Sequence, residues 1–91
     1  MNRIEKYNII KQEIDRWDPV GLLSDGAPES EYNIEITKIS SLFIEEVTEE
    51  TLAQHIHDVF LEMFDESTYT KAKNIIECKE IAKNILDRIN N

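Results

Sequence analysis

Apolar side chains recur along this chain at steps of three and four residues, and this spacing limits the possible folds more than any other feature. Residues at such steps share one face of an α-helix, so each repeat predicts an amphipathic helix with one buried side. Four repeats are present, and they predict helices over residues 3–16, 31–46, 49–64 and 70–89. Four such helices in 91 residues indicate an all-α fold: a compact bundle of about four helices, forming a single helical domain over residues 1–91 with almost no strand.

The first and second predicted helices are separated by one long loop, which we expect to be ordered. Asp18-Pro19 ends the first helix, because a proline disfavours helical geometry in the residue before it and lacks an amide hydrogen. Both prolines and both glycines of the chain lie between residues 18 and 30. The same stretch holds three large aliphatic side chains, Val20, Leu22 and Leu23. A loop of this composition normally folds back over the core.

The chain is strongly acidic, with a formal net charge of -9. This charge repels a phosphate backbone, so we expect no nucleic-acid partner. The charge is uneven: residues 1–66 hold sixteen Asp and Glu against five Lys and Arg, whereas residues 67–91 hold three against five. The C-terminal segment is therefore expected to dock electrostatically against the rest of the chain.

Cysteine content and hydropathy indicate a cytoplasmic protein. Cys78 is the only cysteine, which excludes an intramolecular disulfide and is typical of a reducing compartment. No stretch approaches the roughly 20 apolar residues of a membrane span, and the N-terminus has no apolar run after its charges. We therefore expect neither secretion nor a membrane partner.

The histidines and the cysteine form no recognisable catalytic or metal-binding motif. His55 and His57 are two residues apart, about 200° around a helix axis, whereas two ligands of one metal need a step of three or four. Cys78 lies among apolar residues of a predicted helix and is expected to be a packed thiol. No glycine-rich phosphate loop and no serine-nucleophile motif occur. We therefore predict no metal, no cofactor and no enzymatic activity.

Four glutamates, Glu45, Glu46, Glu49 and Glu50, surround the connection between the second and third helices. Such a cluster can attract a basic partner or a cation. Acidic residues are also typical of a helix N-terminus, where they complement the helix dipole, and Thr48 is the predicted N-cap of the third helix. We favour this second interpretation, in which the glutamates are solvated.

The most unusual stretch is the loop between the first two helices, which holds the candidate binding residues Trp17, Asp18, Glu29, Glu31 and Tyr32. It contains the only tryptophan of the chain, both prolines and four carboxylates. In one interpretation Trp17 and Tyr32 anchor the loop and Asp18 caps a turn. In the other, aromatic and acidic groups on a rigid loop form a recognition surface. We favour the first and keep the second as the hypothesis for binding.

At these residues the chain resembles the DUF1871 family, also called YugE-like, a group of small bacterial proteins of unknown function. The resemblance is carried by Trp17-Asp18-Pro19-Val20-Gly21 and Gly26-Ala27-Pro28-Glu29-Ser30-Glu31-Tyr32, and more weakly by Val59-Phe60 and Ile81-Ala82. It implies a small helical fold and brings no established activity. The family pattern reads Asp-Glu-Tyr-Asp where this chain has Ser30-Glu31-Tyr32-Asn33. Two carboxylates of that pattern are thus absent, which argues against a metal or acid–base role at these positions.

These observations favour a non-enzymatic protein-interaction module, and the acidic charge favours a basic protein partner. The alternative is an immunity protein that neutralises a basic bacterial toxin, because similar Trp-Asp-Pro and Glu-Tyr patterns occur among small proteins that look like immunity partners of toxins. An acidic surface suits either role, since complementary charge speeds association and opposes wrong partners. A monomer and a homodimer fit equally well, because every apolar stripe can be buried within one bundle.

Overall fold

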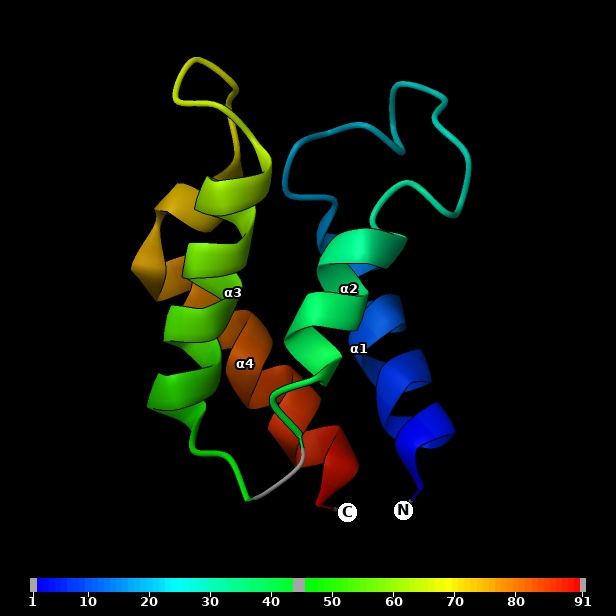
Figure 1. Ribbon diagram of the computed structural model, residues 1–91, viewed down its shortest axis with the longest axis vertical. Coiled ribbons are helices and arrows are strands. Elements are labelled where there is room, and N and C mark those ends of the chain that lie inside the picture. The colour runs from blue at the N-terminus through cyan, green and yellow to red at the C-terminus, as the bar shows by residue number, and fades with distance from the viewer. Residues whose placement is uncertain (1, 44–45, 91) are drawn as a thin grey trace.

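The computed structural model describes residues 2–43 and 46–90, and every regular element in that part of the chain is a helix. The elements are α1 (Arg3–Trp17), α2 (Asn33–Ser40), α3 (Glu49–Met63), the short 3₁₀ helix η1 (Lys71–Lys73) and α4 (Ile75–Ile89) (Figure 1). The radius of gyration is 12.2 Å, in agreement with the value of about 12 Å expected for a compact chain of this length. The predicted all-α bundle of about four helices is therefore confirmed.

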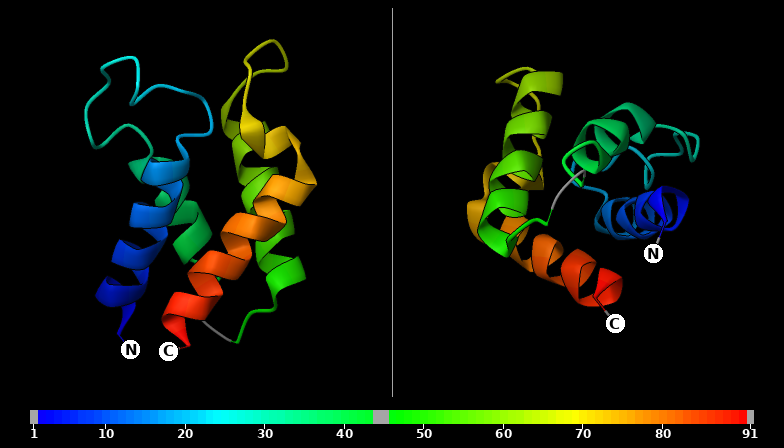
Figure 2. Two further views of the ribbon diagram at one scale, coloured as in Figure 1. Left: turned by 180° about the vertical axis from the view of Figure 1, so that it is seen from behind. Right: turned by 60° about the horizontal axis from the view of Figure 1, so that its bottom comes forward.

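The helices α1 and α2 run antiparallel, as do α2 and α3, while α4 crosses behind them and packs against α1 and α3 (Figures 1 and 2). The two ends of the described chain lie at one end of the bundle, and the α1–α2 and α3–α4 connections lie at the other (Figure 1). None of the described helices combines the length and apolar character that a membrane crossing requires.

Capping residues fix where α3 begins and where α1 ends. The Thr48 hydroxyl accepts the N–H of Thr51 at 3.1 Å, which confirms Thr48 as the N-cap of α3. Asp18 follows the last residue of α1 and adopts a left-handed conformation with φ of 48°. Asp tolerates this conformation better than most residues. The first helix therefore ends where the Asp18-Pro19 pair predicts.

The second helix is shorter than predicted, which corrects the range 31–46. α2 ends at Ser40, and residues 41–43 form a turn. The hydroxyls of Ser40 and Ser41 donate to carbonyl oxygens three residues before them, at 3.0 and 2.6 Å. Such bonds compete with the backbone hydrogen bonds of a helix, and two in succession favour its termination. Residues 44 and 45 of the predicted range lie outside the described part of the chain.

The fourth predicted helix, residues 70–89, is interrupted and forms two elements. The side chain of Asn74 accepts the N–H of Ile76 at 2.9 Å and begins α4. Thr70 begins η1 in the same way, because its hydroxyl accepts the N–H of Ala72 at 3.1 Å. A cap residue has non-helical backbone geometry. The apolar stripe therefore continues across Asn74 although the helix does not.

The core is organised around Phe60 of α3. The Phe60 ring meets the ring of Trp17 edge to face at 6.3 Å between centroids, and the ring of Tyr32 in the same manner at 5.9 Å. On the other side it stacks on Phe64 at 5.9 Å. Aromatic rings prefer these arrangements. Because Trp17 ends α1 and Tyr32 precedes α2, the cluster ties both ends of the long loop to α3.

The other buried residues of the core all lie within the four predicted helical ranges. The buried aliphatic and thiol side chains are Ile10, Ile14, Ile36, Ile39, Leu52, Ala53, Ile56, Val59, Ala72, Cys78, Ala82 and Ile85. Val20, Leu22 and Leu23 of the long loop pack against them, which confirms that this loop is ordered over the core. By contrast, Ile4 and Ile76 are 73% and 65% exposed. Each lies in the first turn of its helix, where the stripe extends beyond the core.

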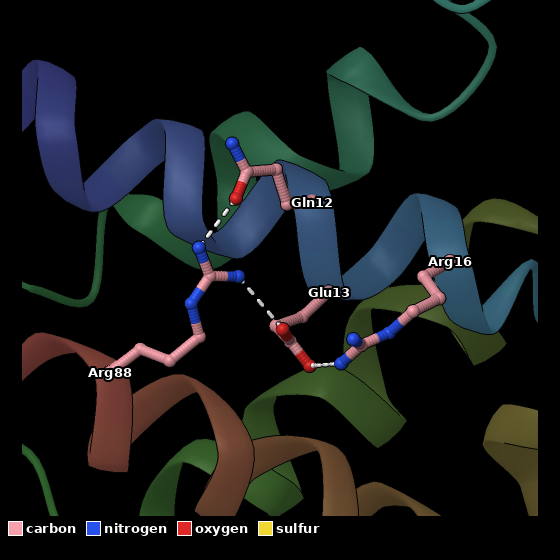
Figure 3. A network of polar contacts seen from close by, with 4 residues as sticks. All are labelled: Gln12, Glu13, Arg16 and Arg88. Atoms are coloured by element: carbon pink, nitrogen blue, oxygen red, sulfur yellow. Dashed lines mark hydrogen bonds and ion pairs between the residues drawn. The ribbon is translucent and has the colours of Figure 1, made fainter.

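A buried carboxylate joins α1 to α4 (Figure 3). Glu13 is 1% exposed, and one of its oxygens accepts a hydrogen bond from Arg16, on the next turn of α1. The other accepts from Arg88 Nη1 of α4 at 2.8 Å, and Arg88 also donates to Gln12. A buried carboxylate is stable only when it is paired, so these two guanidinium groups permit the burial of Glu13. The contact confirms the expected electrostatic docking of the C-terminal segment.

We predict that Glu13→Gln lowers the free energy of unfolding by about 1–3 kcal/mol, because the amide keeps the shape but loses the charge that two guanidinium groups bond. Chemical denaturation at neutral pH measures this loss. Glu80→Gln, at an exposed position of α4, is the matched control and should change stability by less than about 0.5 kcal/mol. Equal, small effects in both variants would contradict a stabilising role for the Glu13 network.

Candidate functional site

The long loop between α1 and α2, residues 18–32, is closed by a hydrogen bond between its two ends. The Tyr32 hydroxyl donates to Asp18 Oδ1 at 2.6 Å and accepts from the backbone N–H groups of Val20 and Leu22 at 3.2 and 3.4 Å. Burial and the adjacent Asp18 carboxylate raise the pKa of Tyr32 far above its usual value. The hydroxyl therefore keeps its proton and remains a donor to Asp18.

The Asp18 carboxylate organises the middle of the same loop. It accepts the backbone N–H groups of Leu23 and Ser24 at 3.1 and 3.0 Å. The chain can turn back toward Asp18 because Gly21 has φ of 80°, which glycine adopts without strain. Burial raises the pKa of the Asp18 carboxyl, but the hydrogen bonds from Tyr32, Ser24 and Leu23 together outweigh burial and hold the pKa below its usual value. The ionised carboxylate is the form that the loop stabilises.

The start of the loop is also fastened to the opposite side of the bundle. The backbone N–H of Lys71 donates to the carbonyl oxygen of Pro19 at 2.8 Å. The Lys71 side chain donates through Nζ to the carbonyl oxygen of Trp17 at 3.2 Å. The indole N–H of Trp17 donates to Glu77 of α4 at 3.3 Å. Trp17 is only 9% exposed, so it has a packed apolar face and a bonded polar edge.

Lys11 of α1 fastens the end of the loop. Its Nζ donates to Asp15 Oδ2 at 2.8 Å, to the carbonyl oxygen of Glu29 at 2.7 Å and to Asn33 Oδ1 at 3.0 Å. Three acceptors match the three donors of an ammonium group. The backbone at Glu29 is therefore fixed, while the Glu29 side chain is exposed.

The five candidate binding residues fall into two groups. Trp17 and Tyr32 are buried, and the Asp18 carboxylate is engaged by the loop, so these three residues hold the loop in place. Glu29 and Glu31 are exposed, and their side chains form no hydrogen bond or ion pair with any described residue. We call the side chains of Glu29 and Glu31 the acidic loop surface.

A third carboxyl group, that of Glu35, lies next to this surface and is buried. Glu35 is in the first turn of α2 and is 5% exposed. Burial raises the pKa of Glu35, its own amide N–H opposes this effect, and the negative charge of Glu31 one turn earlier raises the pKa further. The sequence pattern did not single out Glu35, although a signal was present. Glu35 stands three residues after Tyr32 and four before Ile39, on the apolar face of its helix.

The remaining candidate groups do not converge. His55 Nε2 lies 3.0 Å from the carbonyl oxygen of Lys38, and His57 Nδ1 lies 3.4 Å from Asp58. Cys78 is buried and donates to a backbone carbonyl at 3.3 Å, and burial raises its thiol pKa to about 12, so the nucleophilic thiolate is scarce at neutral pH. Over residues 2–43 and 46–90, no group of three or more His, Cys, Asp and Glu side chains could hold a metal ion.

The glutamates around the second connection lie apart from the long loop in sequence and structure. Glu46, Glu49 and Glu50 are exposed, and Glu45 lies outside the described residues. Glu49 and Glu50 occupy the first turn of α3, which is the position that the helix-dipole interpretation expects.

A family model described as a domain of unknown function (DUF1871) matches residues 8–90. This range contains all of α2, α3, η1 and α4, the five candidate binding residues and Glu35. No curated protein and no solved structure matches the chain.

We predict that Tyr32→Phe lowers the free energy of unfolding by about 1–3 kcal/mol, because it removes one of the donors to Asp18 Oδ1 and leaves two loop amides without their acceptor. Equilibrium denaturation measures the effect. Tyr7→Phe is the control: Tyr7 is half-buried and its hydroxyl bonds no described residue, so the change should be below about 0.5 kcal/mol. If the two variants lose the same stability, the Tyr32 hydroxyl does not hold the loop.

We predict that Asp18→Asn costs about 1 kcal/mol at neutral pH and that this deficit relative to the wild type narrows in acid. The pKa of Asp18 is lower in the folded than in the unfolded chain. Its ionisation therefore stabilises the fold above its usual pKa, and this contribution is lost as pH falls through the folded-state pKa. Unfolding curves recorded from neutral pH to about pH 3 test this. A deficit that stays constant over that range would contradict it.

Proposed function

The chain belongs to the DUF1871 family, which is described as a domain of unknown function, so we propose a role from the site itself. The protein is a non-enzymatic, cytoplasmic protein-interaction module that binds a basic partner protein through the acidic loop surface. The observation that carries this proposal is the contrast within the loop. Its backbone is fixed by Tyr32, Lys71 and Lys11, whereas the side chains of Glu29 and Glu31 are exposed and unpaired.

The fixed backbone favours binding. Ordering a flexible segment at an interface costs free energy, and a loop that is already ordered in the free protein avoids most of that cost. The bonds to Lys11 and Lys71 attach the loop to α1 and η1. The loop therefore presents its two carboxylates on a backbone that is already ordered in the free protein.

The overall charge favours a basic partner. The net charge of -9 attracts a basic protein over several ångströms and raises the association rate, an effect that salt screens. The same charge opposes binding to nucleic acid. The acidic loop surface adds a local contribution, since complementary charges at an interface fix orientation and exclude wrong partners.

The chemistry of the side chains supports a non-enzymatic role. Catalysis by a cysteine or serine needs a nucleophile in contact with a base. In the described part of the chain, His55 and His57 bond a backbone carbonyl and a carboxylate, not a hydroxyl or thiol, and Cys78 is buried. These groups have packing and surface roles in the proposal.

A toxin-neutralising immunity protein is a narrower form of the same proposal. The high negative charge favours it, because a basic toxin that acts on nucleic acid has a cationic surface that an acidic protein can cover. In that case one partner binds tightly, and binding abolishes the activity of the partner.

We predict that wild-type protein immobilised on a column retains a basic protein from bacterial lysate at low salt and releases it at moderate salt. The double variant Glu29→Gln/Glu31→Gln should retain several-fold less of that protein, chiefly through slower association, because exposed interface charges act mostly on the association rate. Association rates of the recovered partner, measured at two salt concentrations, test this directly.

The matched control is Glu49→Gln/Glu50→Gln, which removes the same charge from the first turn of α3. It should retain nearly as much partner as the wild type. If the control loses as much as the loop variant, the overall charge, rather than the acidic loop surface, is responsible for binding. If the retained partner is acidic or is a small molecule, the proposal is wrong.

A further inference from the structure

The buried carboxyl group of Glu35 has no partner among the residues that the structure describes. Apart from its own amide N–H, its carboxyl meets no hydrogen-bond donor and no cation among the described residues. Burying a carboxylate without a partner is costly, and buried polar groups in folded proteins are nearly always bonded. Glu13, the other buried glutamate of the described residues, is bonded by two arginines. Glu35 has no such partner among these residues, and its carboxyl group keeps only a small contact with solvent.

Two lysines close to α2 are engaged elsewhere. Lys38, the only basic residue of α2, directs its Nζ toward Glu62 of α3, at 3.9 Å. Lys11, whose Nζ reaches Asn33 at the start of α2, already has three acceptors. Neither lysine is therefore available to Glu35, so a cation of another molecule can take this place.

Glu35 lies beside the acidic loop surface, at the end of α2 nearest to the long loop (Figure 1). The backbone already turns helically before α2 begins, because the N–H of Asn33 bonds the carbonyl of Ser30 at 3.0 Å and that of Ile36 bonds the carbonyl of Tyr32 at 2.9 Å. Residues four apart in such a segment lie on one face. Glu31 and Glu35 thus form a pair, one exposed and one buried.

We propose that Glu35 and Glu31 together receive an arginine side chain of the basic partner, with Glu35 as the buried end of the site. This inference rests on the proposed function, because it needs a basic partner at the acidic loop surface. A guanidinium group has five donors in a planar fork, so one group can bond two neighbouring carboxylates. It is also more weakly hydrated than an ammonium group, so it loses less on entering a nearly buried site.

The two carboxylates have different tasks in this site. Glu31, which is solvated, attracts the arginine and orients it. Glu35 is already largely removed from water in the free protein, at 5% exposure, so its pairing with the arginine is worth more than that of a surface charge. In this proposal Glu35 lowers the stability of the free protein and gains a charged partner only in the complex.

The test uses a synthetic oligo-arginine peptide as the probe and the full chain as the protein. Calorimetry at neutral pH should show that Glu35→Gln weakens peptide binding by about tenfold or more, the loss expected for a charged hydrogen-bonded pair. The same variant should raise the Tm, because glutamine fills the same space without a buried charge. Glu80→Gln removes the same charge from an exposed position of α4, which does not pack against α2 in the described structure, and it should change neither quantity appreciably.

Several results would overturn the inference. If Glu35→Gln binds the peptide as the wild type does while Glu31→Gln binds more weakly, the acidic loop surface remains but Glu35 is not part of the site. A lower Tm for Glu35→Gln would make Glu35 a structural residue. Equal affinity for an oligo-lysine peptide of the same length would overturn the preference for arginine. If the wild type binds neither peptide, or if Glu80→Gln loses as much affinity as Glu35→Gln, the proposed function fails together with the inference.

Discussion

The hydrogen bond from the Tyr32 hydroxyl to the Asp18 carboxylate is the interaction on which the rest of the structure depends. It joins the residue that follows α1 to the residue that precedes α2 at 2.6 Å. The same two side chains bond four backbone N–H groups of the loop, which would otherwise be left without partners near the core. The ring of Tyr32 packs on Phe60, so the loop is coupled to the aromatic centre of the bundle.

Two buried glutamates show how the fold separates stability from recognition. Glu13 is bonded by Arg16 and Arg88, and the three residues join α1 to α4 (Figure 3). Glu35 is buried to nearly the same degree but has no such partner among the described residues. A group that lowers stability is retained when it serves a function, because selection removes only variants that fall below the stability that folding requires. In our proposal Glu13 contributes to the fold and Glu35 contributes to the complex.

Much of the fold is predictable from apolar spacing, because a helical stripe buried in a bundle has a fixed period. The α1 and α3 boundaries follow from the Asp18-Pro19 pair and from Thr48. The end of α2 after Ser40 depends on two side-chain hydrogen bonds to the backbone and the break at Asn74 on one, and these bonds do not alter the apolar period. In the loop, the side-chain types of Trp17, Asp18 and Tyr32 predict that these residues anchor it. The three acceptors of Lys11 and the burial of Glu35 depend instead on contacts between segments distant in sequence. Spacing alone cannot predict such contacts.

The central claim is that the long loop is an ordered part of the bundle in the free protein, and amide hydrogen exchange measured by nuclear magnetic resonance tests it most directly. The informative amides are those of Val20 and Leu22, which donate to the Tyr32 hydroxyl, and those of Leu23 and Ser24, which donate to the Asp18 carboxylate. We expect these amides to be protected to a degree similar to those in α1, because they become exposed only when the network of Tyr32 and Asp18 opens. Exchange at the rate of an unstructured peptide at these four amides would contradict it.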